Sequence, residues 1–245
     1  MAWIKAKHEG DLAGVAARLY HSNIILSDLD DTLAKSPMKK VAYGFLKRPD
    51  MLANPKFIAW CAKAAWKKAV KGKKAESELG REFVEKFLDG RERKKLEEKM
   101  SFDYMDELRE SAFPGVFSFY SMLPNAMKII VTRSIHEIAW AYRCALDFDF
   151  SMEEQYDKKK SVDFIMRVFP KLKRYAIFGD SAEDEEMVDY LRFQLVKGSI
   201  DTLVSVHIAK SEKKANPDFD CSIGRNYSSL AELISKYFRL SSSSQ

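Results

Sequence analysis

Two aspartates that directly follow a short apolar run, Asp28 and Asp30, carry the clearest chemical signal in the chain. The run at residues 24–26 has apolar side chains at consecutive positions, which is typical of a strand buried on both faces of a parallel sheet. With Asp31, three carboxylates fall within four residues at the end of this strand. They would repel one another and lose hydration unless a cation neutralised them. Oxygen ligands favour a hard divalent ion, so the sequence predicts a Mg²⁺ site here.

Three further groups of polar residues follow other predicted elements. Thr132 comes directly after an apolar strand at 127–131, and a lysine run at 158–160 opens a helix. A strand at 175–178 runs into a Gly-Asp-Ser turn that holds Asp180 and is followed by Asp184. Because ligands of parallel sheets bind at the carboxyl ends of the strands, we expect these groups to gather around Asp28.

The four pieces, in this order, resemble the haloacid dehalogenase-like superfamily, which is dominated by Mg²⁺-dependent phosphohydrolases. The resemblance covers residues 21–34 and 114–238. It implies an α/β fold, a doubly wound parallel sheet with a Rossmann-like core. The alternation of strands and helices along the chain independently favours such a sheet. Where Asp31 stands, many members of the superfamily have glycine.

The resemblance also implies a role for each acidic residue. Asp28 would be the nucleophile that forms an aspartyl phosphate, and Asp30 would be the general acid and then the general base. The expected metal ligands are Asp28, Asp30 through its backbone carbonyl, Asp180 and Asp184. Whether Asp184 touches the metal directly or through water stays open at this point.

Three other residues are expected to hold the phosphoryl group or the substrate. The Thr132 hydroxyl would donate to a phosphoryl oxygen, and its neighbour Arg133 would also bind the substrate. A lysine of the 158–160 run would offset the clustered negative charge. We favour Lys160, because the apolar Phe164 four positions later fits the spacing found in the superfamily, and Lys159 is the close alternative.

An acid two residues after the nucleophile favours phosphate esters over carbon–halogen or phosphonate substrates within this superfamily. The predicted function is therefore hydrolysis of a small phosphate monoester. A phosphotransferase or phosphomutase would use the same chemistry with a different attacking group. A non-catalytic binding protein that uses a basic helical segment is the alternative from another class.

The chain is expected to divide into two domains. Residues 1–34 and 114–245 would form the α/β core, and residues 35–113 an all-helical cap of three or four helices inserted after the first predicted strand. Only 25 residues separate Thr132 from Lys158, which is too few for a second kind of cap at that place. Substrate selectivity would then lie in the helical segment.

Charge is concentrated in the same segment. The whole chain carries a net charge of +5, whereas residues 35–74 carry +11 and the remainder −6. Lysines interleaved with Trp60 and Trp66 can attract an anionic substrate, a membrane surface or a nucleic acid. The simpler alternative is a solvated helix with both tryptophans packed inward, and no nucleic-acid partner is expected.

The remaining features point to an ordinary globular protein. No run of 18 apolar residues predicts a membrane span, and the early charges do not fit a secretory signal, so a cytoplasmic location is expected. Three scattered cysteines argue against a disulfide framework or a zinc site. The serine-rich end, residues 241–244, is predicted to be disordered.

Overall fold

The computed structural model describes residues 3–8, 10–35, 46–71, 74–99, 105–155 and 157–238. Its centre is a seven-stranded sheet in the order β1-β7-β6-β5-β2-β3-β4. All neighbouring strands are parallel except β1 and β7, which pair antiparallel at one edge. The strands are β1 (Ile4–Ala6), β2 (Ile24–Ser27), β3 (Met127–Val131), β4 (Phe150–Met152), β5 (Arg174–Gly179), β6 (Thr202–Ile208) and β7 (Cys221–Ile223).

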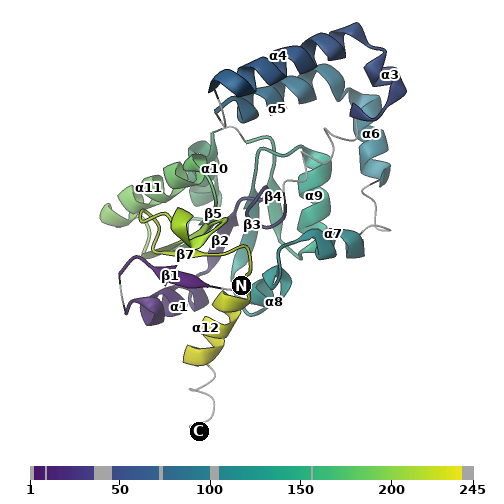
Figure 1. Cartoon of the computed structure of the whole chain (residues 1–245). Coiled ribbons are helices and arrows are strands. Elements are labelled where there is room, and N and C mark those ends of the chain that lie inside the picture. Colours follow the sequence, from purple (N-terminus) through teal and green to yellow (C-terminus); the bar gives the residue numbers. More distant parts are fainter. Residues whose placement is uncertain are drawn as a thin grey trace.

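Helices cover both faces of this sheet (Figure 1). Because side chains alternate along a strand, Ile25 packs in one apolar cluster while Ile24 and Leu26 pack in the other. The first cluster lies under α1 (Leu12–Tyr20), α8 (Val116–Ser121), α9 (His136–Ala145) and α12 (Ser228–Phe238). The second lies under α10 (Lys158–Val168) and α11 (Ala182–Val196). A short 3-10 helix, η2 (Glu212–Lys214), follows β6.

Strand β2 lies at the centre of the sheet, with β5 on one side and β3 on the other. The chain builds the sheet outward from β2 through β3 and β4, then continues on the opposite side through β5 and β6. A crevice for ligands forms at such a reversal of strand order, outside the carboxyl ends of the strands. The predicted α/β, doubly wound architecture is therefore confirmed.

Two strands were not predicted. β1 and β7 are each three residues long and pair with each other across the whole length of the chain, Ile4 opposite Ile223. Such short strands have little periodicity of their own, and they form because the neighbouring β6 offers a free edge to β7. The sheet is therefore mixed at this edge rather than wholly parallel.

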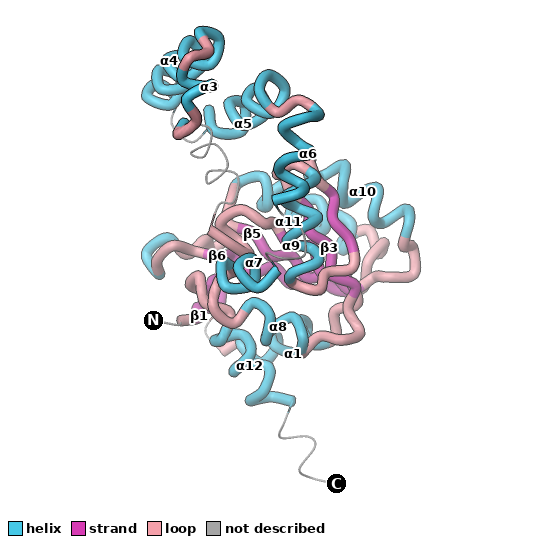
Figure 2. Tube along the Cα trace, turned by 90° about the vertical axis from the view of Figure 1, so that its right-hand side faces the viewer, coloured by secondary structure: helices cyan, strands magenta, loops and turns pink. Residues whose placement is uncertain are grey.

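Five helices occur in the described residues between β2 and α8, where three or four were predicted. The additional one is a single turn that begins at a proline, a residue favoured at the first helical position. These helices are α3 (Pro49–Leu52), α4 (Pro55–Lys71), α5 (Lys74–Phe87), α6 (Gly90–Lys99) and α7 (Met105–Ser111). Figures 1 and 2 show α3, α4 and α5 at the end of the molecule far from the sheet.

The helical segment leaves and rejoins the sheet at one place. The amide of Phe113 donates to the carbonyl of Leu33 at 2.8 Å, and Ala34 forms a bridge with Ala112. The division into a core and a helical cap stays a prediction. No described helix is long and apolar enough to cross a bilayer. The serine-rich end that was predicted to be disordered lies outside the described residues.

Candidate active site

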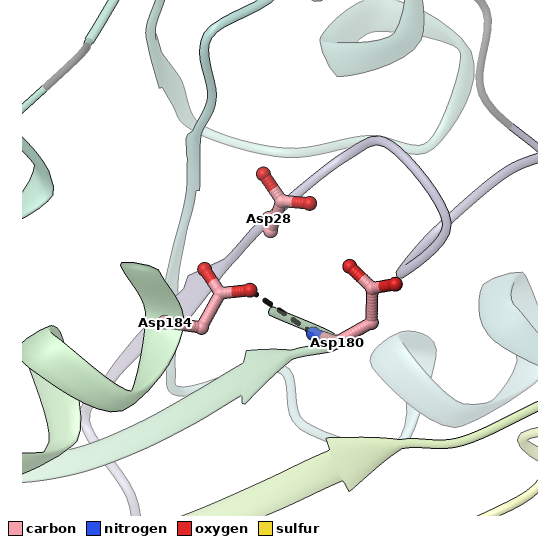
Figure 3. A group of neighbouring side chains, drawn as sticks. All are labelled: Asp28, Asp180 and Asp184. Atoms are coloured by element: carbon pink, nitrogen blue, oxygen red, sulfur yellow. Dashed lines mark hydrogen bonds between the residues drawn. The ribbon is translucent and has the colours of Figure 1, made fainter. Parts of the chain in front are cut away.

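The register of β2 and β5 brings Asp28 and Asp180 together. Ser27 is paired with Phe178, and the next amide, of Asp28, continues the ladder by donating to the Phe178 carbonyl at 3.0 Å. Both aspartates therefore leave their strands at the same end of the sheet, as Figure 3 shows. One carboxylate oxygen from each of Asp28, Asp180 and Asp184 lies within 4.8 Å of the others. This is the predicted acidic cluster.

Asp184 is fixed at the first turn of α11. One of its carboxylate oxygens, Oδ2, accepts hydrogen bonds from the Asp180 amide at 3.0 Å, the Ser181 amide at 3.1 Å and the Ser181 hydroxyl at 2.7 Å. Ser181 and Asp184 form a capping box, which satisfies amides that the helix itself cannot pair. A Cβ at Gly179 would lie 2.2 Å from the Cβ of Asp184, so the close approach of Asp184 to the end of β5 requires glycine.

A buried lysine joins two of the three acids. The Lys158 ammonium donates to Oδ1 of Asp28 at 2.7 Å and to Oδ1 of Asp184 at 2.6 Å. Burial lowers the pKa of Lys158, but attraction to Asp184 and Asp28 outweighs it and the pKa is raised. The side chain therefore stays an ammonium, which offsets part of the negative charge of the cluster.

The preference for Lys160 needs correction. Its side chain is 84% exposed and its ammonium lies 3.3 Å from Asp157, outside the cluster. Lys159, the stated alternative, lies over the ring of Tyr190. Lys158 shares the inner face of α10 with Val162 and Ile165, which pack against the sheet. Val162 and Ile165 follow Lys158 by four and seven residues. This helical spacing is the signal in the sequence that places Lys158 on the inner face of the helix.

The electrostatics of the cluster favour an added cation. Burial, with help from Asp184 and Asp30, raises the pKa of Asp28 to about 8 against the opposing effect of Lys158. Burial and the charges of Asp184 and Asp31 raise the pKa of Asp180 to about 7. One ammonium therefore does not compensate these carboxylates, and the buried oxygen donors suit a hard divalent ion.

The three carboxylates differ in how many hydrogen bonds they already accept, and therefore in their capacity to bind a metal. Asp184 already accepts four hydrogen bonds. Among the described residues, nothing donates a hydrogen bond to the carboxylate of Asp180, and the carboxylate of Asp28 accepts only the bond from Lys158. The residues therefore fit a metal held by Asp28 and Asp180, with Asp184 orienting the amides and the ammonium around it.

The carboxylate of Asp30 has other contacts than those of the acidic cluster. The hydroxyl of Ser134 donates to Oδ2 of Asp30 at 2.5 Å. The hydroxyl of Tyr142 lies 2.5 Å from that of Ser111, and the charge of Asp30 contributes, after burial, to a raised pKa of Tyr142. Sequence reasoning did not identify Ser134, in the loop after β3, or Tyr142, on α9, because their proximity to Asp30 depends on tertiary packing.

Thr132 and Arg133 directly follow β3. Thr132 is fully buried, and its Oγ1 accepts a hydrogen bond from the Ser134 amide at 3.1 Å. Arg133 donates to Glu183 in the first turn of α11 at 2.8 Å. Arg133 thus joins the loop after β3 to the first turn of α11, and the substrate-binding roles of both residues stay predictions.

The chain resembles known proteins in its structure but not in its sequence. No family model matches the chain, and no curated protein matches its sequence. Among solved structures, the chain is similar to cytosolic 5'-nucleotidase IIIB bound to cytidine, with a TM-score of 0.52 and 10% identity over 97% of this chain and 95% of that chain. The chain therefore shares its fold with that nucleotidase structure. At this identity the likeness concerns the fold alone, and the residues of the site carry the functional argument.

The turn that follows Asp28 has an unusual backbone conformation. Asp31 has a φ of +64°, a left-handed conformation that glycine adopts without strain and aspartate adopts better than most residues. Its carboxylate is held by Arg225 at 2.7 Å and lies 3.6 Å from the ammonium of Lys210. These two cations explain how an aspartate is accommodated beside the acidic cluster.

Proposed function

We propose that the chain is a Mg²⁺-dependent phosphatase that hydrolyses a small phosphate monoester through an aspartyl phosphate on Asp28. The observation that carries this proposal is the Asp28 carboxylate at the end of β2, paired with the buried Lys158 and adjacent to Asp180 at the end of β5. A nucleophile, a fixed ammonium and a pair of carboxylates for a metal are the parts that phosphoryl transfer requires.

Asp28 and Asp180 would hold the metal with their carboxylates. The superfamily resemblance adds the backbone carbonyl of Asp30. When bound, a divalent ion neutralises charge on the phosphoryl oxygens and on the carboxylates. Asp184 serves as a positioning residue, because its carboxylate fixes the Lys158 ammonium and the Asp180 amide.

In the first step, Lys158 holds Oδ1 of Asp28, which leaves Oδ2 to attack phosphorus. The new bond joins Oδ2 to phosphorus, and the bond from phosphorus to the ester oxygen breaks. Asp30, protonated before the step, gives its proton to the departing oxygen, so the leaving group departs as an alcohol. Ser134 orients the Asp30 carboxyl through its hydroxyl.

In the second step, Asp30 is a carboxylate and acts as the general base. It takes a proton from a water molecule whose oxygen attacks phosphorus, and the bond from phosphorus to Oδ2 of Asp28 breaks. Inorganic phosphate leaves, Asp28 is again a carboxylate, and Asp30 is again protonated. If an acceptor alcohol replaces this water, the same steps give a phosphotransferase.

The substrate is proposed to be a small phosphorylated compound. Nucleoside monophosphates are the first class to test, because the structural neighbour is a 5'-nucleotidase bound to cytidine. Thr132 and Arg133 would contact the phosphoryl group or its substituent. Residues 35–113 would act as a helical cap that selects the substrate and excludes water, and the enzyme would work in the cytoplasm.

Release of inorganic phosphate tests this proposal. We expect release from at least one member of a panel of nucleotides, sugar phosphates, phosphoamino acids and an aryl phosphate in Mg²⁺, and none with a chelator. Asp28→Asn should abolish release, whereas Asp157→Asn, which changes an exposed aspartate outside the cluster, should retain it. Equal release by Asp28→Asn and the parent chain would refute the mechanism.

A further inference from the structure

The outer face of α4 is apolar and exposed. Ile58, Trp66 and Val70 have exposed fractions of 53%, 66% and 63%. The other members of this face are alanines, which are also exposed: Ala59, Ala62, Ala65 and Ala69. At about 100° per residue, these seven positions fall within an arc of roughly 140° that contains no charged residue. We name these seven residues the α4 outer face.

The opposite side of α4 accounts for the stability of the helix in the fold. Phe57 packs edge-on against Phe87 with ring centroids 5.2 Å apart, and Trp60 packs against Phe83 at 5.4 Å. The expectation that both tryptophans pack inward therefore fails for Trp66. The helix has two apolar faces. Within the described part of the chain, only one of them packs against other elements.

Lysines border the outer face. Lys63 and Lys56 lie along one edge of the apolar arc and Lys68 along the other, and α4 contains no acidic residue. Lys63 is paired with Glu82 of α5 at 2.7 Å, while Lys56 is exposed. Long lysine side chains at the edge of an apolar strip can keep their ammonium groups in water while the strip is buried.

We propose that the α4 outer face binds the surface of a bilayer that contains anionic phospholipids. The apolar strip would lie at the level of the acyl-chain boundary, and the bordering lysines would contact lipid phosphates. A nucleic acid is a poorer partner, because the centre of the face lacks the cations that phosphates need. A second copy of the chain is also a poorer partner, because it would place two lysine-rich helices against each other.

The position of α4 allows this interaction. Figures 1 and 2 both place α4 at the end of the molecule far from the sheet, so a flat surface can approach it. The sheet, with the acidic cluster at the ends of β2 and β5, lies far from α4 (Figure 1). Binding would therefore hold the chain at a membrane surface while the acidic cluster stays accessible. This inference is independent of the proposed function.

Co-sedimentation of the full chain with phosphatidylcholine vesicles, with and without phosphatidylserine, tests the proposal. We expect binding only to vesicles that contain phosphatidylserine, and weaker binding at higher salt. Val70→Glu should reduce binding at least tenfold. Val196→Glu is the matched control, because Val196 is 87% exposed on α11, and it should bind as the parent does.

Tryptophan fluorescence gives a second measurement. Trp66 should move to shorter emission wavelengths on vesicle addition, and Trp66→Phe should lose that shift but retain binding. Equal binding by Val70→Glu and Val196→Glu would refute the proposal, as would absence of binding to every vesicle. Self-association that Val70→Glu abolishes, without vesicle binding, would also refute it and assign the face to a second copy.

Discussion

Removing the Lys158 ammonium tests the electrostatic account of the site. Lys158→Met keeps the length and apolar body of the side chain but leaves Asp28 and Asp184 without their shared cation. The lysine side chain is 2% exposed, and those of the two acids are 9% and 0% exposed. Breaking a buried ion pair by removing one partner costs about 3–5 kcal/mol, a large part of the stability of a typical domain.

Lys160→Met is the matched control, since it removes an ammonium two residues away whose side chain is 84% exposed. A surface pair of this kind contributes about 0–1 kcal/mol. Urea unfolding in chelator at pH 7.5 compares the two free energies of unfolding. Phosphate release, if the proposed function holds, should fall roughly 100-fold or more in Lys158→Met only.

The reasoning predicts that acid partly rescues Lys158→Met, because the two carboxyl groups can then be protonated. A loss of stability below about 1 kcal/mol in Lys158→Met, or equal losses in the two variants, would refute the assignment of Lys158. A large loss of stability that is the same at pH 5 and pH 7.5 would show that packing, not charge, is responsible.

Three further predictions concern the surroundings of the cluster. Gly179→Ala should destabilise the chain and abolish phosphate release because its Cβ collides with Asp184, whereas Gly90→Ala, which meets no atom within 4 Å, should be neutral in both assays. Without metal, the two raised carboxyl pKa values, about 8 and about 7, mean that the folded state binds more protons than the unfolded state above pH 4. Thermal stability in chelator should therefore fall from pH 4 to pH 8, and Mg²⁺ should stabilise the chain more at pH 8 than at pH 5. Asp180→Asn should weaken both effects. A thermal stability that does not change with pH would contradict this prediction. Ser134→Ala should lower kcat and shift the pH dependence of kcat while KM changes little, and Ser134→Thr should restore the profile; a change in KM alone would indicate a structural role.

The sequence predicts best those site residues that directly follow buried strands. Asp28 and Asp180 each follow an apolar run, and a parallel sheet brings such positions together whatever the length of chain between them. The acidic cluster and the α/β architecture follow from that rule. Lys158 was missed because the superfamily's spacing, an apolar residue four positions after the lysine, was matched to Phe164, which is 53% exposed, and not to the buried Val162.

Other features depend on tertiary contacts that leave no local pattern. The bond from Ser134 to Asp30 joins two loops 104 residues apart, and β1 forms only because β7 lies beside it. The exposure of Trp66 was likewise unpredictable, because both faces of α4 are apolar and periodicity does not say which one is buried.

The most direct test of the central claim is detection of the phosphorylated nucleophile. The protein would be mixed with a substrate found in the panel and Mg²⁺, quenched in acid, digested and analysed by mass spectrometry. We predict a peptide carrying one phosphoryl group on Asp28, absent with chelator and absent from Asp28→Asn. Phosphate release without phosphorylation of Asp28, retained in Asp28→Asn, would contradict the account.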